Sequence, residues 1–315
     1  MKTIFMTGGG GAGAVYATRK LRELNYRVIL GDMNEWAAGL KFADKSYTLP
    51  SGDSDNFIEV VKTIIKDENV DVFIPLIDEE ILKSYQLKNV KVLLPRYEFS
   101  KMCLDKWELY RAFKENGLPI PETQTIGAFE NVTDICTDYS IIIKPRFGRG
   151  SRDVYEIKSM EEFVEEYLAY KTLTRLPDYK IICQQKLSGT EYTVSVVVNN
   201  HNDLIAVVPK EIIQKRGITI SAITKRNEAI ERLCYAICDK LKPCGSFNVQ
   251  LIIQDGVPYV FEINPRFSTT IALTMEAGIN EIELSLSDRH SGGLLPFEEG
   301  LVMSRYYDQL FWGAK

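Results

Sequence analysis

The segment Phe247–Arg266, FNVQLIIQDGVPYVFEINPR, carries amide and carboxylate side chains at the spacing of a β-strand. Two runs of alternating apolar and polar residues flank an Asp-Gly pair, a pattern that predicts a β-hairpin. Successive side chains of a strand point to opposite faces, so Gln250 lies on the polar face of the first run. If the loop extends from Asp255 to Val257, Gln250 lies directly opposite Glu262, about 5 Å away.

The polar face of this hairpin offers ligands for a metal ion. In the second run, Glu262 and Asn264 share the face of Gln250, whereas Phe261 lies on the opposite, apolar face. Oxygen ligands with a single charge suit Mg²⁺ that nucleotide phosphates also hold. The alternative is an ordinary sheet with one solvated face, on which Gln, Glu and Asn are common.

The residues that follow the second strand favour the metal site over the solvated face. Pro265 ends the strand, and Arg266 lies beside the carboxylate, where it could bind a phosphate. Ser268, Thr269 and Thr270 then begin a predicted helix, and the N–H groups at a helix N-terminus attract anions.

A second motif, Ser140–Asp153 (SIIIKPRFGRGSRD), joins an apolar strand to a glycine-bearing loop. Lys144 ends the strand and supplies a point charge, while Gly148 and Gly150 let backbone N–H groups approach phosphates closely. The order of residues is not that of a P-loop. A surface hairpin with basic side chains is the alternative interpretation.

Together these motifs resemble the ATP-grasp family, and most closely the ATP-grasp halves of the carbamoyl phosphate synthetase large subunit. GSFNVQ and VFEINPRFSTTIALTMEAG carry the resemblance most specifically. It implies that Gln250, Glu262 and Asn264 coordinate Mg²⁺ and that Arg266 contacts the transferred phosphate or an acyl phosphate. Many members carry Glu where this chain has Gln250, and the synthetase-like branch carries Gln.

The resemblance also implies an ATP site in which Lys144 binds the phosphates and acts with Arg266 in catalysis. Lys106 matches a second basic position, with a solvated helix lysine as the competing interpretation. The implied lid comprises Phe147, Gly148, Arg149, Gly150 and Ser151. The implied contacts to adenine and ribose are Gln184, Gln185, Leu187 and Glu191.

Five residues are candidates for contact with the other substrates, namely Asp78, Glu79, Lys210, Arg216 and Thr269. The two acidic residues follow an apolar strand and could line a cleft, or could simply cap the next helix. A solvated strand edge explains the lysine and the arginine equally well.

The N-terminus carries a competing signal. Gly8, Gly10 and Gly13 satisfy GxGxxG between a predicted strand and a helix, and Asp32 follows at the end of the next strand, as in a dinucleotide site. An NAD(P)-dependent oxidoreductase is therefore an alternative. Against it, the chain has only two histidines and no evident Tyr/Lys pair for hydride transfer.

The elements that must position these residues follow from the alternation of strand and helix signals. Over residues 1–95 we expect strands at Thr3–Met6, Arg27–Leu30, Val72–Ile77 and Val90–Leu94, and helices at Ala14–Leu24 and Asp55–Lys66, the second capped by Asp53 or Asp55. Further on we expect a strand at Ser140–Lys144 and helices at Asp105–Asn116 and Met160–Tyr170.

The expected fold is α/β followed by α+β. A Rossmann-like, parallel-sheet domain that precedes the ATP-grasp fold should occupy residues 1–95. The two ATP-grasp subdomains should occupy residues 96–182 and 183–289, and residues 290–315 should close the fold with one more strand or helix.

The amino-acid composition argues against nucleic-acid and membrane functions. With 38 basic and 43 acidic residues and no basic block, the chain is not expected to bind nucleic acid. It shows no apolar stretch long enough for a signal peptide or a membrane span, and its six cysteines form no CxxC pair. We therefore expect a cytoplasmic protein with reduced thiols and no membrane partner.

The resemblance implies a ligase that phosphorylates a carboxylate with ATP and passes the acyl group to an amine or thiol, releasing ADP and phosphate. The expected cofactors are ATP and Mg²⁺, with Mn²⁺ as a substitute, and the partners are small-molecule carboxylate and amine substrates. A homodimer is compatible with this interpretation. A nucleotide-binding subunit without its own turnover is a further alternative.

Overall fold

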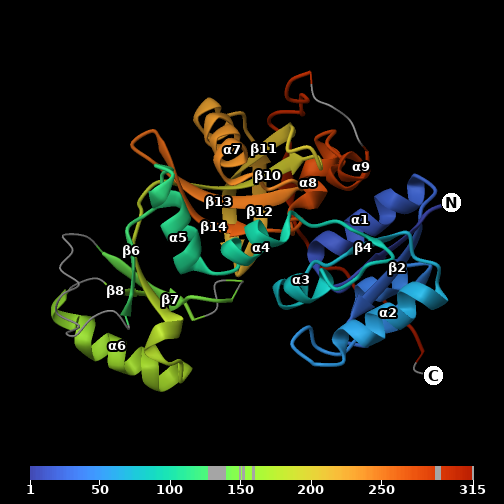
Figure 1. The fold of residues 1–315 in the computed structure, drawn as a ribbon, viewed down its shortest axis with the longest axis horizontal. Coiled ribbons are helices and arrows are strands. Elements are labelled where there is room, and N and C mark those ends of the chain that lie inside the picture. The colour runs from blue at the N-terminus through green and yellow to red at the C-terminus, as the bar shows by residue number, and fades with distance from the viewer. Residues whose placement is uncertain (127–139, 149, 151–152, 158–159, 288–291, 314–315) are drawn as a thin grey trace.

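The structure of the 315-residue chain is a computed structural model that describes residues 1–126, 140–148, 150, 153–157, 160–287 and 292–313. The predicted lid residues Arg149 and Ser151 lie outside the described residues. Three β-sheets follow one another along the chain, and Figure 1 shows the N-terminal one at the right and the smallest one at the lower left.

The first sheet is parallel and has the strand order β3-β2-β1-β4-β5. Its strands are β1 (Thr3–Met6), β2 (Arg27–Asp32), β3 (Lys45–Thr48), β4 (Val72–Ile74) and β5 (Lys91–Val92). All four residues of the central strand β1 are buried, as expected for a strand that helices cover on both faces.

Helices pack on both faces of this sheet. They are α1 (Ala12–Glu23), α2 (Phe57–Asp67), α3 (Asp78–Ser84) and the 3₁₀ helix η1 (Ala38–Phe42). Ala17 and Leu21 of α1 pack with Ile4 and Met6 of β1, whereas α2 packs on the opposite face, around Phe5. The predicted βαβ organisation is thus confirmed.

Two details of this region differ from the sequence-based expectation. The strand predicted at Val72–Ile77 ends at Ile74, because Pro75 follows and has no N–H to continue the ladder of hydrogen bonds. Neither Asp53 nor Asp55 caps α2. The turn before the helix already satisfies the first N–H, since Phe57 N donates to the Ser54 carbonyl.

The second sheet is antiparallel and has the order β6-β9-β7-β8. Its strands are β6 (Thr123–Thr125), β7 (Ile141–Pro145), β8 (Tyr155–Ile157) and β9 (Ile181–Gln185). The helix α6 (Met160–Thr174) packs on it, with Phe163, Tyr167 and Tyr170 against the strand isoleucines, and the 3₁₀ helix η4 (Asp178–Lys180) leads into β9.

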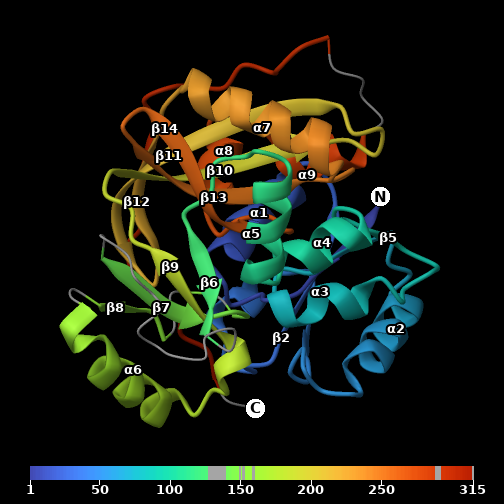
Figure 2. The same cartoon turned by 60° about the vertical axis from the view of Figure 1, so that its left-hand side comes forward.

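The third sheet has six strands in the order β14-β13-β10-β11-β12-β15. They are β10 (Thr190–Val198), β11 (Leu204–Arg216), β12 (Ile218–Thr224), β13 (Phe247–Gln254), β14 (Val257–Asn264) and β15 (Val302–Ser304). The helix α7 (Glu228–Leu241) packs on one face together with α4 (Tyr97–Cys103) and α5 (Lys106–Glu115), as Figure 2 shows. The short helices α8 (Ile271–Glu276) and α9 (Glu281–Leu286) lie on the other side and also pack against α1.

The hairpin of β13 and β14 differs from its prediction in two details and confirms the predicted pairing of Gln250 with Glu262. Its loop is only two residues long, since Gln254 pairs with Val257. Gln250 nevertheless pairs with Glu262, because Phe261 is an extra residue that forms a β-bulge. The prediction that Phe261 lies on the apolar face is therefore wrong, and its side chain lines the same pocket as Glu262.

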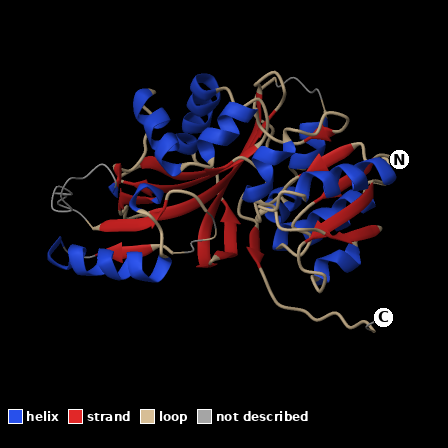
Figure 3. Cartoon of the chain, turned by 60° about the horizontal axis from the view of Figure 1, so that its bottom comes forward, coloured by secondary structure: helices blue, strands red, loops and turns tan. Residues whose placement is uncertain are grey.

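These sheets confirm the predicted fold class, a parallel-sheet α/β domain followed by two antiparallel α+β units. The exact domain boundaries stay a prediction. The strand expected in the last segment is β15, after which residues 305–313 run on without helix or strand (Figure 3). In the part of the chain that the structure describes, no helix has the length and apolar character that a membrane crossing requires.

Candidate active site

A pocket of about 210 Å³ lies between the second and third sheets. Most of the residues predicted to bind ATP or metal line it together, although they come from five strands, one helix and two loops. These residues are Lys106, Lys144, Phe147, Gly148, Gln184, Gln185, Leu187, Glu191, Gln250 and Glu262. We call it the nucleotide pocket.

Lys144 is the buried charge of the nucleotide pocket. It ends β7, and its Nζ donates a 2.7 Å hydrogen bond to Oε1 of Gln184 on the neighbouring strand β9. Burial lowers the pKa of Lys144 to about 7, Lys106 adds to this effect and Glu262 opposes it. A bound phosphate would restore full protonation, because an anion beside an ammonium favours its charged form.

Gln184 has a role that its sequence position did not reveal. Its side chain is 3% exposed, and its Nε2 donates to Oγ1 of Thr123 at 2.8 Å while its Oε1 accepts from Lys144. Both ends of the amide are therefore occupied, and the amide fixes the position of the lysine. Gln185 and Leu187, the other predicted adenine contacts, line the same pocket.

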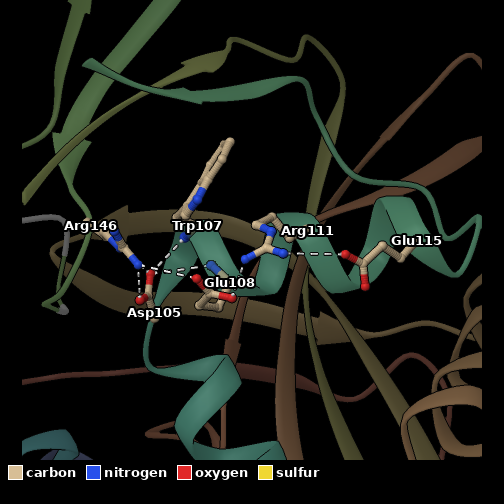
Figure 4. A network of polar contacts seen from close by, with 6 residues as sticks. All are labelled: Asp105, Trp107, Glu108, Arg111, Glu115 and Arg146. Atoms are coloured by element: carbon tan, nitrogen blue, oxygen red, sulfur yellow. Dashed lines mark hydrogen bonds and ion pairs between the residues drawn. The ribbon is translucent and has the colours of Figure 1, made fainter. Parts of the chain in front are cut away.

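Lys106 is the first residue of α5, directly after Asp105, whose hydrogen-bond network Figure 4 shows. Asp105 caps this helix by accepting from Trp107 N at 3.0 Å, and Arg146 donates two 2.6 Å hydrogen bonds to the same carboxylate. The Lys106 Nζ then donates to the Gly148 carbonyl at 2.7 Å. The network joins α5 to the loop after β7, so Lys106 and Lys144 line the same pocket.

The glycine-bearing loop after β7 adopts conformations that favour glycine. Gly148 has φ +120° and Gly150 has φ +71°, and no atom would meet a Cβ at either position within 4 Å. Phe147 of the same loop is half exposed and lines the nucleotide pocket.

The three predicted metal ligands, Gln250, Glu262 and Asn264, belong to two adjacent cross-strand pairs of β13 and β14. Gln250 pairs with Glu262, and Asn248 pairs with Asn264. Among the described residues no cluster of three His, Cys, Asp or Glu side chains could hold a metal, so any site here must depend on amides. One carboxylate with two amide oxygens fits an Mg²⁺ ion that phosphates also hold.

Arg266 lies at the opposite end of this ligand set. Its Nε donates a 2.6 Å hydrogen bond to Oδ1 of Asp78, and its Nη2 donates to Oδ1 of Asn264 at 3.1 Å. Asp78, the first residue of α3, is thus the ion-pair partner of Arg266. Glu79 follows it in the first turn of that helix. It lines neither the nucleotide pocket nor the larger cavity next to Arg266.

Glu191, the predicted ribose contact, forms an ion pair with Lys215 at 2.5 Å. Lys215 also lines the nucleotide pocket, and its Nζ lies 5.9 Å from the centre of the Phe261 ring. Lys215 was not among the predicted site residues, although it directly precedes the candidate Arg216 in the sequence.

A second, larger cavity of about 1330 Å³ lies next to Arg266. Arg216 and Thr269, both predicted as substrate contacts, line it together with the glycines of the N-terminal GxGxxG segment. We call it the substrate cavity.

The prediction that Lys210 contacts a substrate is wrong. Its side chain is 0% exposed, and its Nζ donates to Oγ of Ser195 at 2.6 Å and to Oγ1 of Thr274 at 2.7 Å. Ser195 in turn donates to the buried carboxylate of Glu281 at 2.7 Å. Lys210 therefore joins β10 and β11 to α8 and α9 inside the protein.

The N-terminal glycines have local structural roles. Gly10 N and Asn34 N donate to the two carboxylate oxygens of Asp32, at 2.8 and 2.9 Å, so this carboxylate holds its own loop. A Cβ at Gly13 would lie 3.1–3.2 Å from Ile271 and Thr269, so glycine allows α1 to approach α8 closely.

Comparison with known proteins gives two family-model matches, an ATP-grasp domain over residues 103–270 and a PylC-like, N-terminal domain over residues 4–92. The chain is 28% identical over 289 residues to the carbamoyl phosphate synthase large chain of Campylobacter jejuni, covering 83% of this chain and 26% of that one. It thus spans about a quarter of the length of the curated relatives that it matches.

Two solved structures share the fold at lower identity. The biotin carboxylase domain dimer of Hydrogenobacter thermophilus 2-oxoglutarate carboxylase, in complex with MgADP, ADP and bicarbonate, has a TM-score of 0.76 and 15% identity, covering 93% of this chain and 72% of that chain. Staphylococcus aureus N5-carboxyaminoimidazole synthetase complexed with ADP has a TM-score of 0.74 and 16% identity, covering 97% and 82%.

Proposed function

The chain belongs to the ATP-grasp family, and on that premise we propose that it is an Mg²⁺-dependent ligase that uses ATP to join a carboxylate to an amine or a thiol. The observation that carries the proposal is the convergence of Lys144, Gln250 and Glu262 on one pocket from strands of two different sheets. Clamping a nucleotide between two sheets in this way also excludes water from the reacting phosphate.

Each side of the nucleotide pocket has its own task in this proposal. Lys144 and Lys106 bind the phosphates, and Glu191 accepts hydrogen bonds from the ribose hydroxyls. Gln250, Glu262 and Asn264 would hold Mg²⁺, whose charge would offset that of the phosphates, and Mn²⁺ is the expected substitute. Arg266 is oriented by Asp78 toward the site where the phosphate is transferred.

The proposed reaction has two steps. A carboxylate oxygen attacks the γ-phosphorus, the bond between that phosphorus and the ADP oxygen breaks, and ADP leaves. The acyl phosphate then reacts at its carbonyl carbon with an amine, which loses a proton to solvent as inorganic phosphate departs. Lys144 and Arg266 stabilise the negative charge on the transferred phosphoryl group and do not form covalent bonds.

The test is ADP release with MgATP, one amine and a panel of amino acids and small carboxylates, followed by mass spectrometry of the products. We expect at least one carboxylate to stimulate ADP release and the Lys144→Ala protein to show none. Tight MgATP binding without stimulated release by any carboxylate would instead support a nucleotide-binding subunit.

A further inference from the structure

The substrate cavity has three walls from distant parts of the chain. The first is the glycine segment Gly8–Gly13 with α1, the second is the segment Arg266–Ala272, and the third is the edge formed by β12, β15 and the residues after β15. Small-molecule pockets usually enclose roughly 300–1,000 Å³. At about 1330 Å³, this cavity has room for a substrate far larger than acetate or bicarbonate.

The charges that line the cavity favour an anion. Four of the charged lining residues are arginines and two are acidic. Asp78 already neutralises Arg266, and Lys20 pairs with the lining residue Glu276. The exposed Arg216 differs, since its side chain has no hydrogen bond or ion pair within the described part of the chain. An unpaired guanidinium at a cavity wall suits a carboxylate, which it can bind through two parallel hydrogen bonds.

Arg305 holds the three walls together. Its Nη2 donates to the Thr269 carbonyl at 2.6 Å, its Nε to the Thr219 carbonyl at 2.9 Å and its Nη1 to the Ala12 carbonyl at 3.5 Å. These carbonyls belong to the segment before α8, to β12 and to α1. The chain that leaves β15 is therefore fixed at its first residue.

The next residues present large apolar side chains beside the cavity. Tyr306 is 84% exposed and Tyr307 is 94% exposed, yet both line the cavity, as do Leu310 and Ile218. Neither tyrosine makes a hydrogen bond or ring contact with another described residue. Exposed aromatic rings on an anchored segment supply contact area for an apolar ligand.

The position of Arg216 sets the orientation of such a ligand. Arg216 precedes Gly217 at the turn between β11 and β12, and a Cβ at Gly217 would lie 3.9 Å from the Gly150 carbonyl. Gly150 belongs to the loop whose Gly148 lines the nucleotide pocket. Arg216 thus lies at the end of the cavity that is next to the nucleotide pocket.

We propose that the substrate cavity binds an organic acid with a bulky apolar body. Arg216 binds its carboxylate beside the nucleotide pocket, and Tyr306 packs against its apolar body. This inference rests on the proposed function, because it assigns the carboxylate that ATP would phosphorylate, but its binding test needs neither ATP nor turnover.

The test is calorimetric titration of the nucleotide-free protein with 3-phenylpropionate, acetate and the neutral 3-phenylpropanamide. We expect saturable binding of 3-phenylpropionate, at least about tenfold tighter than that of acetate or of the amide. Arg216→Gln should weaken 3-phenylpropionate binding about tenfold, and Tyr306→Ala about threefold to tenfold. Arg232→Gln and Tyr235→Ala are matched controls on the exposed side of α7 and should leave it unchanged.

The proposal is overturned if 3-phenylpropionate does not bind saturably, if the amide binds equally well, or if Arg216→Gln binds the acid as the wild type does. The MgATP affinity of the same protein samples shows whether the substrate class or the proposed function itself has failed. If 3-phenylpropionate does not bind but MgATP binds normally, only the substrate class is refuted. If MgATP does not bind to the wild type, the proposed function itself is refuted.

Discussion

Arg266 and Asp78 lie 188 residues apart in the sequence and form a nearly buried ion pair, with 2.6 Å between Nε and Oδ1. The pair joins the first helix turn after β4 to the end of the hairpin that carries the metal ligands. Because the orientation of Arg266 depends on one carboxylate from helix α3, we expect it to be sensitive to changes far from the nucleotide pocket.

Asp78→Asn should therefore lower both stability and turnover. Removing one partner of a buried pair leaves an uncompensated charge, and at this small residual exposure we expect a loss of about 2–4 kcal/mol in the free energy of unfolding. Urea denaturation and kcat measure the two effects. Asp55→Asn, at an exposed position, is the control, and an unchanged kcat in a folded Asp78→Asn protein would contradict the role given to the pair.

Glu262→Gln should abolish turnover while preserving the fold. Glu262 supplies the only full charge among the three proposed ligands, and loss of one group that stabilises the transition state costs on the order of 10²–10³ in rate. The measurement is ADP release at saturating MgATP, beside the melting temperature. Glu228→Gln removes an exposed carboxylate of α7 as a control, and near-wild-type turnover by Glu262→Gln would refute the metal site.

Substitutions of Lys144 and of the glycines in the following loop should have different effects on ATP affinity and on kcat. Lys144→Ala should weaken ATP binding as well as kcat, because the ammonium meets the phosphates in the ground state. Gly148→Ala and Gly150→Ala meet no neighbouring atom but impose positive φ on alanine, so they should lower kcat more than ATP affinity. Equal losses of affinity and kcat in all three variants would show that lysine and loop act as one unit.

The buried Lys210 should make the stability of the protein depend on pH. Burial lowers the pKa of Lys210 to about 8 from its ordinary value of 10.5, and Glu281 opposes this shift. Between pH 8 and 10.5 the unfolded chain thus binds more protons at this site than the folded one, so its contribution to the free energy of unfolding rises with pH. The increase in the free energy of unfolding between pH 8 and 10.5 should be smaller in Lys210→Met than in the wild type. Lys62→Met, at an exposed position, is the control, and urea denaturation at each pH measures the effect.

The glycine-rich N-terminus should not bind dinucleotides. Because Asp32 holds its own loop, NADH and NADPH should leave the melting temperature unchanged, whereas MgATP at a hundred times its Kd should stabilise the protein by about 2.7 kcal/mol. Thermal denaturation with each ligand decides this. Saturable NADH binding in the micromolar range, with no effect of ATP, would favour the oxidoreductase.

The sequence was informative wherever a short-range pattern determines the structure. Strand alternation and the Asp-Gly turn predicted that Gln250 faces Glu262, and the apolar run before Lys144 predicted its strand. Both follow from the fixed period of side chains along a strand.

Long-range packing determined what the sequence could not show. The pattern of strand β11 does not distinguish a buried lysine from an exposed one at position 210. Lys210 is buried because α8 and α9 pack over it, with Thr274 and Glu281 beside its ammonium group. The same holds for Gln184, whose partner Lys144 lies 40 residues away in the chain. No local pattern specifies such partners.

The bulge at Phe261 also bears on how this hairpin can vary among proteins. A two-residue turn followed by one extra strand residue places Gln250 opposite Glu262, and a three-residue turn without the extra residue would place the same two side chains together. An insertion at the turn and a deletion at residue 261 therefore compensate each other. What such an exchange would remove is the aromatic ring, whose centre lies 5.8 Å from the Lys144 ammonium and 5.9 Å from that of Lys215.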